Sequence, residues 1–201
     1  AIFSTNFKHL MLTHHSAATP PTYTLRNDKG KVTKTLQDNA ALKQKVDGMN
    51  LASIEFFQFQ TQDGVDLNGV MVKPANFDAS KKYPVILFQY SGPGSQQVQD
   101  SWYVGNCSAA LLERYMAQEG FVSVIVDGRG TGGRGAEFEK QTYLKLGQLE
   151  SHDQVETAIY LSKLPWVDAK HIGIWGWSFG GFNTLMSMSE GRPVFYAGVA
   201  V

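Results

Sequence analysis

The chain of 201 residues has too little cysteine for an internal disulfide, and its cysteine and histidine residues are not spaced as metal ligands. Its single cysteine, Cys107, excludes an internal disulfide, and we expect this side chain to be a small buried apolar group. His14 and His15 are adjacent and have no partners at zinc-binding intervals, so no metal site is predicted. A run of about 18 apolar residues is also missing, so no membrane span is predicted in this segment.

An excess of charge of either sign is absent too. The 18 basic residues balance the 18 acidic residues, and the formal net charge is zero. Basic residues such as Lys81 and Lys82 do not form a block interleaved with aromatic residues, so nucleic acid is not an expected partner. The glycine-rich stretch 127–135 lacks the Gly-Lys-Ser/Thr ending of a phosphate-binding loop and matches a dinucleotide fingerprint only weakly. We interpret it as a tight loop near the site and predict no cofactor.

The most informative stretch that is present is Gly-Trp-Ser-Phe-Gly-Gly at residues 176–181. It follows an apolar run at 171–175 and opens a helix-like segment at 182–189. The order of strand, Gly-x-Ser-x-Gly and helix is typical of the nucleophile elbow of an α/β-hydrolase. The turn would lift the Ser178 hydroxyl clear of the sheet and point the Phe179 N–H at a developing oxyanion. Ser178 is therefore the candidate nucleophile, and the alternative is a glycine-rich turn with an idle serine.

The acid and base that such a serine needs are missing after it. In this fold the triad runs in the chain order Ser, Asp or Glu, then His. Residues 179–201 contain no Asp or His, and Glu190 is their only acid. Either the chain is a fragment of a longer enzyme, or it is a scaffold that has lost its chemistry. We favour the fragment, because residues 197–201 read as the start of a further core strand.

The first residues of the chain have a different pattern from the rest. Strands are predicted at 7–14, 21–25 and 32–36, with a turn at 27–30 and no helix between them. This pattern is typical of part of an all-β domain, and we predict a domain boundary that separates residues 1–40 from 41–201. A short polar helix that ends at Gly48 is predicted to connect the two parts.

The remainder alternates strands with helices. A hairpin is predicted from 54–61 and 67–73 around Asp63-Gly64, followed by buried strands at 85–90, 121–126 and 171–175. One helix is predicted at 108–119, with Ser108 as its N-cap and its apolar positions at Leu111, Leu112, Tyr115 and Met116. A second is predicted at 153–164 and ends at Pro165. The pattern predicts an α/β fold with a mostly parallel sheet and flanking helices.

Two loops follow the buried strands and lie on the same predicted rim as Ser178, where sites form in open α/β sheets. Tyr90 could point its hydroxyl at an oxyanion, or it could be the last packing residue of its strand. Asp127 could be taken for a triad acid, but chain order favours an ion pair with Arg129 or Arg134 instead.

Two histidines of this part, His152 and His171, are further candidates for a base that takes the Ser178 proton. His152 is expected to precede a helix, in an exposed or capping position. His171 is expected to start a strand. Chain order disfavours both as the triad histidine.

Three motifs taken together resemble a known family. They are Tyr-Ser-Gly-Pro-Gly-Ser-Gln at 90–96, Asp-Gly-Arg-Gly-Thr-Gly at 127–132, and Gly-Trp-Ser-Phe-Gly-Gly at 176–181. With Lys-Lys-Tyr-Pro at 81–84, they are similar to the prolyl oligopeptidase family of serine peptidases, over nearly the whole chain. The resemblance implies that residues 1–40 are closing strands of an N-terminal β-propeller and that 41–201 begin the catalytic α/β-hydrolase domain. The family usually has Tyr after the serine, where this chain has Phe179.

The resemblance also implies roles and a reaction. Ser178 would be the acylated nucleophile, Tyr90 the side-chain oxyanion donor and Phe179 the backbone donor. The implied activity is release of dipeptides from peptide N-termini, with Pro or Ala second. The alternatives are an esterase or acylaminoacyl-peptidase-like hydrolase, and a non-catalytic scaffold or binding module. The implied substrates are peptides, and the full-length protein would be periplasmic, secreted or at the cell surface and could form a homodimer.

Overall fold

The computed structural model describes residues 1–105 and 110–201, which form two compact units. The first, here called the antiparallel unit, comprises Ala1–Leu51 and Asp100–Ala110. The second, here called the sheet unit, comprises Ala52–Gln99 and Leu111–Val201. The expected cap Ser108 and the expected buried Cys107 lie outside the described residues. No helix in the described part of the chain has both the length and the apolar content that crossing a membrane requires.

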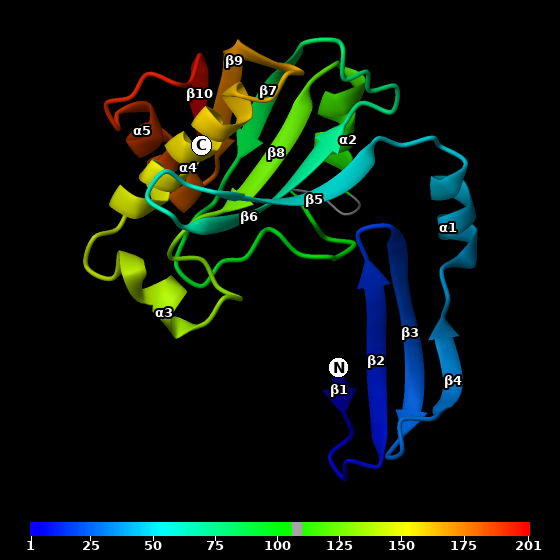
Figure 1. The fold of residues 1–201 in the computed structure, drawn as a ribbon. Coiled ribbons are helices and arrows are strands. Elements are labelled where there is room, and N and C mark those ends of the chain that lie inside the picture. Colours follow the sequence, from blue (N-terminus) through cyan, green and yellow to red (C-terminus); the bar gives the residue numbers. More distant parts are fainter. Residues whose placement is uncertain (106–109) are drawn as a thin grey trace. The chain divides into compact units, whose positions relative to one another are not determined.

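The antiparallel unit is a four-stranded sheet in the order of the chain (Figure 1). Its strands are β1 (Ile2–Phe3), β2 (His9–Ser16), β3 (Thr19–Asn27) and β4 (Val32–Gln37). The turn between β3 and β4 closes through a hydrogen bond from the Gly30 N–H to the Asn27 carbonyl, and Gly30 has φ +77°, which suits a residue without a side chain. The antiparallel strands are therefore confirmed, whereas their assignment to a propeller domain that ends at residue 40 stays a prediction.

Helix α1 (Ala40–Asp47) follows β4 and is amphipathic only weakly, with none of its residues buried. It ends at Gly48, whose N–H donates to the Gln44 carbonyl at 3.2 Å, so the predicted helix and its end are confirmed. Within the same unit, the Asp100 carboxylate accepts the Ala17 N–H at 2.8 Å.

The sheet unit contains a six-stranded mixed sheet in the order β10-β9-β7-β8-β6-β5. Strands β7, β8, β9 and β10 are parallel to one another, β6 pairs antiparallel with β8, and β5 pairs antiparallel with β6. The strands are β5 (Ser53–Gln60), β6 (Asp66–Lys73), β7 (Tyr83–Phe88), β8 (Val122–Asp127), β9 (Val167–Gly176) and β10 (Ala197–Ala200). The predicted mostly parallel sheet is thus confirmed, together with the hairpin at its far edge.

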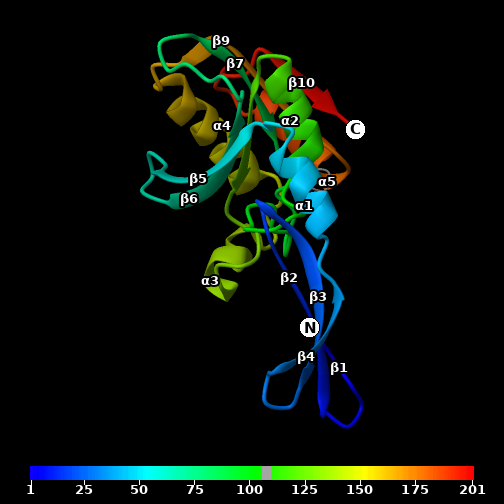
Figure 2. The same cartoon turned by 90° about the vertical axis from the view of Figure 1, so that its right-hand side faces the viewer.

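Helices cover both faces of this sheet (Figures 1 and 2). They are α2 (Leu111–Gln118), α4 (Gln148–Ser162) and α5 (Phe179–Met188). The short helix α3 (Ala136–Glu139) and the 3₁₀ turn η2 (Lys140–Thr142) lie in the segment between β8 and α4. Alternation along the strands decides the core, because successive side chains point to opposite faces. One face packs Val85, Leu87, Val124 and Ile174 against α4, and these side chains are almost fully buried. Burying each such side chain contributes about 1.5–3 kcal/mol relative to leaving it exposed.

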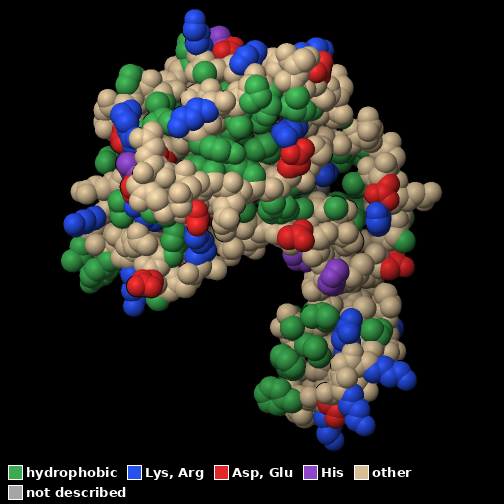
Figure 3. All heavy atoms as spheres, in the orientation of Figure 1, with side chains coloured by type: hydrophobic (Ala, Val, Ile, Leu, Met, Phe, Trp, Pro, Cys, Tyr) green, Lys and Arg blue, Asp and Glu red, His purple; other side chains and the backbone are tan. Residues whose placement is uncertain are grey.

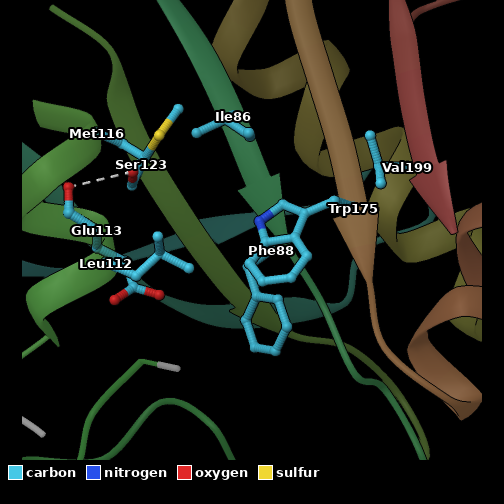
Figure 4. A pocket seen from close by; sticks show the side chains of 8 residues that line it. All are labelled: Ile86, Phe88, Leu112, Glu113, Met116, Ser123, Trp175 and Val199. Carbon is cyan, nitrogen blue, oxygen red and sulfur yellow. Dashed lines mark hydrogen bonds between the residues drawn. The ribbon is translucent and has the colours of Figure 1, made fainter. Parts of the chain in front are cut away.

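The opposite face of the sheet lies next to α2 and borders a pocket of about 260 Å³ that is open to solvent on one side (Figure 4). Its lining is mostly apolar, and the rings of Phe88 and Trp175 lie 4.9 Å apart in it. The Ser123 hydroxyl donates to the main-chain carbonyl of Glu113 at 3.5 Å across the same space. The lining residues are Ile86, Phe88, Leu112, Glu113, Met116, Ser123, Trp175 and Val199.

Two of the predicted helices differ from the structure. In α2 the buried residues are Glu113, Arg114 and Ala117, whereas the predicted core positions Leu111 and Tyr115 are about half exposed. The helix contacts β6 and β8, the small Ala117 is fully buried, and burial lowers the pKa of Arg114. The apolar spacing therefore predicted the helix, and of its four apolar positions Leu112 and Met116 line the pocket beside the sheet, whereas Leu111 and Tyr115 do not.

Helix α4 begins five residues before the predicted start at 153, at Gln148. The first turns of α4 consist of polar residues, so the apolar spacing of the sequence does not indicate that they are helical. These residues are nonetheless buried, among them Glu150, Asp153 and Gln154, because the helix lies between the sheet and neighbouring segments. His152 is consequently inside the helix and half-buried, not before it and exposed.

Candidate active site

Ser178 lies at the sharp turn between the end of β9 and the start of α5. Its backbone has φ 57° and ψ −117°, a conformation that a residue with a side chain rarely adopts. The Ser178 N–H donates to the Val201 carbonyl at 2.7 Å, and the Val201 N–H donates to the Gly176 carbonyl at 3.1 Å. Contacts with β9 and with the residue after β10 hold this strained turn, and the side chain of Ser178 is exposed at the carboxyl end of the parallel strands.

The glycines on both sides of Ser178 are required by close approach of the main chain. A Cβ on Gly176 would lie 2.4 Å from the Gly180 carbonyl oxygen and 2.6 Å from that of Gln89. A Cβ on Gly180 would lie 2.4 Å from the same Gln89 oxygen. Real Cβ contacts are longer than this, so neither position accepts a side chain without displacing backbone. This packing is the physical reason for the Gly-x-Ser-x-Gly pattern in this chain.

Helix α5 starts directly after the serine, at Phe179. The Phe182 N–H donates to the Ser178 carbonyl at 3.0 Å, and the Gly180 N–H donates to the Trp177 carbonyl at 2.8 Å. The Phe179 N–H belongs to the first turn, whose N–H groups have no partner within the helix. The positive end of the helix dipole adds to this donor, so the position beside Ser178 favours a negative charge.

Tyr90 comes from the loop after β7 and lies beside the elbow. The centroid of its ring is 6.3 Å from that of Phe179, and both side chains are half-buried. A Cβ on Gly92 would lie 2.7 Å from the Tyr90 ring, so a residue with a side chain at position 92 would collide with this ring. The structure thus brings Tyr90, Ser178 and Phe179 to one rim of the sheet, as the sequence predicted for their positions in the fold.

Gln89 was not identified from the sequence, because it lies at the end of an apolar strand without any motif. Its side chain is fully buried, and its Nε2 donates to the Gly180 carbonyl at 2.5 Å. Its Oε1 accepts the side-chain amide of Asn183 at 3.0 Å. A polar residue at the end of a buried strand is the one sequence signal that could have singled it out.

The glycine-rich loop after β8 packs against the loop that follows Tyr90. The Gly132 N–H donates to the Ser95 carbonyl at 2.7 Å, and a Cβ on Gly132 would lie 3.2 Å from the Gly94 carbonyl oxygen. The interpretation of this stretch as a tight loop with close backbone approach is consistent with these contacts. Gly130, Gly133 and Gly135 all have positive φ angles.

Asp127 does not form the ion pair that was expected for it. Its carboxylate accepts the main-chain N–H groups of Gln97 and Val98, at distances between 2.8 and 3.1 Å. Burial raises the pKa of Asp127, and these two N–H groups partly oppose that shift. The residue therefore holds the loop after Tyr90, because two N–H donors of that loop reach it and a guanidinium does not.

Arg129 instead joins α4 to the turn of the β5–β6 hairpin. Its guanidinium donates to the Asp153 carboxylate through Nη2 at 2.6 Å and to the Asp63 carboxylate through Nη1 at 2.8 Å. Burial opposes ionisation of Asp63, but hydrogen bonds from Thr61 and Arg129 outweigh it and lower the pKa of Asp63 to about 2. Arg129 thus forms ion pairs, as expected, but with Asp153 and Asp63 in place of Asp127.

The two histidines of the sheet unit both lie away from Ser178. His171 is in β9, hydrogen-bonded through Nδ1 to Asp168 at 2.7 Å, and Gly176 at the far end of the strand is about 16 Å away at 3.3 Å per residue. His152 contacts Arg192 and Glu190, which follow the other end of α5. Helix α5 has ten residues and so places about 15 Å between that end and the serine. Neither histidine is placed to take the Ser178 proton.

A mixed sheet with parallel central strands, helices on both faces and a strained serine between β9 and α5 defines the α/β-hydrolase class. Comparison with known proteins agrees and is more specific. The model of the prolyl oligopeptidase family matches residues 109–201. This part of the chain, which carries Ser178 and helix α5, is therefore similar to the prolyl oligopeptidase family of peptidases.

Named relatives are similar over much more of the chain. The chain is 35% identical over 202 residues to a probable dipeptidyl peptidase 4 of Aspergillus flavus, covering 99% of this chain and 26% of the relative. It is 38% identical over 173 residues to a dipeptidyl peptidase 4 of Arthroderma otae, covering 86% of this chain and 22% of the relative. The chain thus spans about a quarter of the length of these curated relatives.

Solved structures show the same similarity. The crystal structure of Porphyromonas gingivalis dipeptidyl peptidase 4 matches 99% of this chain with a TM-score of 0.92 and 46% identity, over 28% of its own length. A putative dipeptidyl aminopeptidase IV from Bacteroides ovatus matches 98% of this chain with a TM-score of 0.87 and 37% identity, over 27% of its own length. At these identities the likeness extends from the fold to the family.

Proposed function

We propose that this chain carries the nucleophile of a serine peptidase that releases dipeptides from peptide N-termini, with Pro or Ala in the second position. The observation that carries the proposal is the strained, exposed Ser178 between β9 and the first turn of α5. A serine held in this way at the positive end of a helix suits attack on a carbonyl and stabilisation of the resulting oxyanion. The dipeptidyl peptidase names of the relatives support the substrate class.

In the proposed reaction, the Ser178 Oγ attacks the carbonyl carbon of the second residue while a histidine takes its proton. The tetrahedral intermediate collapses as the C–N bond breaks, and the histidine returns the proton to the leaving amine. Water then hydrolyses the acyl-enzyme ester and releases the dipeptide. Because both histidines of the sheet unit lie away from Ser178, we assign the base and its carboxylate partner to another part of the full-length protein.

The oxyanion of this intermediate would be held by two donors. One is the Phe179 N–H in the first turn of α5, and the other is the Tyr90 hydroxyl from the loop after β7. Since the Tyr90 and Phe179 rings are neighbours, both donors belong to the same small region of the rim. Only the backbone N–H is needed at the residue after the serine, so Phe in place of Tyr leaves this donor intact.

The proposal is tested by Ser178→Ala in the full-length protein that contains this chain. We expect hydrolysis of a Gly-Pro or Ala-Pro amide to fall at least about 10³-fold, because the attacking oxygen is removed. The thermal unfolding midpoint should stay close to that of the wild type, since the Ser178 side chain is exposed. Turnover near the wild-type level in the folded variant would refute the role of Ser178.

The alternative classes differ in measurable ways. An esterase or acylaminoacyl-peptidase-like hydrolase would prefer a p-nitrophenyl ester or an N-acetylated amide to a dipeptidyl amide with a free amino terminus. A non-catalytic scaffold would neither cleave these substrates nor react covalently with a fluorophosphonate. A panel of kcat/KM values for these substrates, with fluorophosphonate labelling, therefore separates the three classes.

A further inference from the structure

The residue between strand β7 and Tyr90 is a fully buried glutamine at a place where an apolar side chain would be enough for packing. Gln89 follows Phe88 and has no exposed surface. A buried amide that loses its partners costs about 1–3 kcal/mol, so such a residue is stable only when its polar atoms are paired. The partners of Gln89 therefore indicate what it holds.

The hydrogen bonds of the Gln89 side chain all go to helix α5. Its Nε2 donates to the Gly180 carbonyl at 2.5 Å and to the Thr184 hydroxyl at 3.1 Å. Its Oε1 accepts the Asn183 side-chain N–H at 3.0 Å. The main chain of Gln89 also joins the end of β7 to β9, because the Gln89 N–H donates to the Trp175 carbonyl at 3.1 Å. One residue thus joins the end of β7 to β9 and to the first turns of α5.

These contacts join the two segments of the chain that carry the proposed oxyanion donors, Tyr90 and Phe179. Tyr90 is the next residue after Gln89, and the Phe179 N–H is one residue before the carbonyl that Gln89 binds. A Cβ on Gly180 would lie 3.1 Å from the Tyr90 Cα, which shows how closely the two segments approach. Any slide of α5 along β7 would therefore change the distance between the donors. A displacement of about 1 Å in such a site can lower the rate on the order of 10²-fold.

The geometry points to Gln89 as a positioning residue for the reaction at Ser178, an inference that rests on the proposed function. Its amide fixes α5 against the end of β7, so that the Tyr90 hydroxyl and the Phe179 N–H converge on one oxyanion. An apolar side chain of similar volume would fill the space, but its dispersion contacts have no direction and would not fix the helix along the strand. Because Gln89 is fully buried, a bound substrate would not contact it, so its effect is expected on kcat and not on KM.

The first test is Gln89→Leu in the full-length protein, with Ser187→Ala as the matched control. Ser187 is also buried in α5, and its hydroxyl donates to the Asn183 carbonyl at 2.7 Å, a hydrogen bond within the helix itself. We expect Gln89→Leu to lower kcat for a Gly-Pro amide about 10- to 100-fold, with KM nearly unchanged. We expect Ser187→Ala to lower only the unfolding midpoint. A loss of kcat no greater than that of the control would overturn the assignment.

A double-mutant cycle with Tyr90→Phe distinguishes positioning from a general structural role. If Gln89 acts through the alignment of Tyr90, Gln89→Leu lowers kcat less in the Tyr90→Phe background than in the wild type. Additive effects would contradict the proposal. If Gln89→Leu does not fold, Thr184→Val replaces it, because this change keeps the volume and removes one of the Gln89 hydrogen bonds. It should give a smaller loss of kcat, and an unchanged kcat with a lowered unfolding midpoint would count against the proposal.

The labelling rate of Ser178 by a fluorophosphonate separates this inference from the proposed substrate class. Labelling needs an aligned nucleophile and oxyanion donors but no dipeptide specificity. If the wild type is labelled yet does not cleave dipeptidyl amides, the substrate class is wrong, and slower labelling of Gln89→Leu still supports positioning. Equal labelling rates would overturn positioning alone. A wild type that is not labelled would overturn both.

Discussion

Tyr90 occupies a position that suits two roles, packing at the end of β7 and stabilisation of an oxyanion beside Ser178. Its ring lies over Gly92 and beside Phe179, so it packs at the end of β7 as well as lying on the rim next to Ser178. Packing requires the ring, whereas oxyanion stabilisation requires the hydroxyl. A substitution that removes only the hydroxyl therefore separates the two roles.

We expect Tyr90→Phe in the full-length protein to lower kcat about 10²- to 10³-fold with little change in KM, because one oxyanion donor is lost. Steady-state kinetics with a Gly-Pro amide measure this. Tyr160→Phe is the matched control, since it removes a phenol hydroxyl from a ring that stacks on Phe59 in the same unit, 4.4 Å between centroids. If Tyr90→Phe raised only KM, Tyr90 would be a binding or packing residue.

At the scale of the element, the turn between β9 and α5 depends on two glycines and on the glutamine that faces them. The contacts that exclude a side chain at Gly176 and Gly180 are with main-chain oxygens, which cannot rotate away. A serine at φ 57° is strained, and the surrounding β9, β10 and β7 main chains keep it there. The elbow is thus a product of the sheet as much as of its own motif.

Gly180→Ala should therefore disturb both stability and reaction. We expect it to destabilise the sheet unit by about 1–3 kcal/mol, as overpacking does, and to lower kcat by displacing α5 from Gln89. Gly173→Ala in β9 is the control, because its nearest neighbour would be the Ala197 carbonyl oxygen at an ordinary 3.6 Å. Thermal unfolding and kcat measured on both variants test this, and equal behaviour of the two would contradict the packing argument.

At the scale of the whole molecule, the sheet unit holds a proposed nucleophile and oxyanion donors without a histidine near them. Apolar surface is also exposed on both units, as the hydrophobic side chains in Figure 3 show. In the sheet unit it includes Trp177, Leu185 and Val199, and every residue of the edge strand β10 is exposed. Exposed strand edges and apolar patches favour association with other chains.

We expect the 201-residue chain expressed by itself to hydrolyse no dipeptidyl amide and to associate in solution. The first expectation follows from the missing base, since an unassisted serine hydroxyl is a weak nucleophile. The second follows from the exposed β10 edge. An amide-hydrolysis assay and light scattering measure the two separately. A soluble, active monomer would mean that His152 or His171 reaches Ser178, while an inert monomer would contradict only the association.

Features that depend on neighbouring residues were determined by the sequence itself. The Asp63-Gly64 hairpin and the end of α1 at Gly48 follow from local turn and helix-end signals, and the buried strands follow from continuous apolar runs. The place of the serine turn follows from its Gly-x-Ser-x-Gly motif, although the sheet holds its conformation. Only the tertiary structure decided where the buried polar groups find partners. The Gln89 side chain binds a carbonyl 91 residues away, and Arg129 binds Asp153 at a separation of 24 residues. Asp127 accepts N–H groups of the loop that follows Tyr90. Such pairings join distant segments whose approach depends on the packed sheet, and no local pattern encodes them.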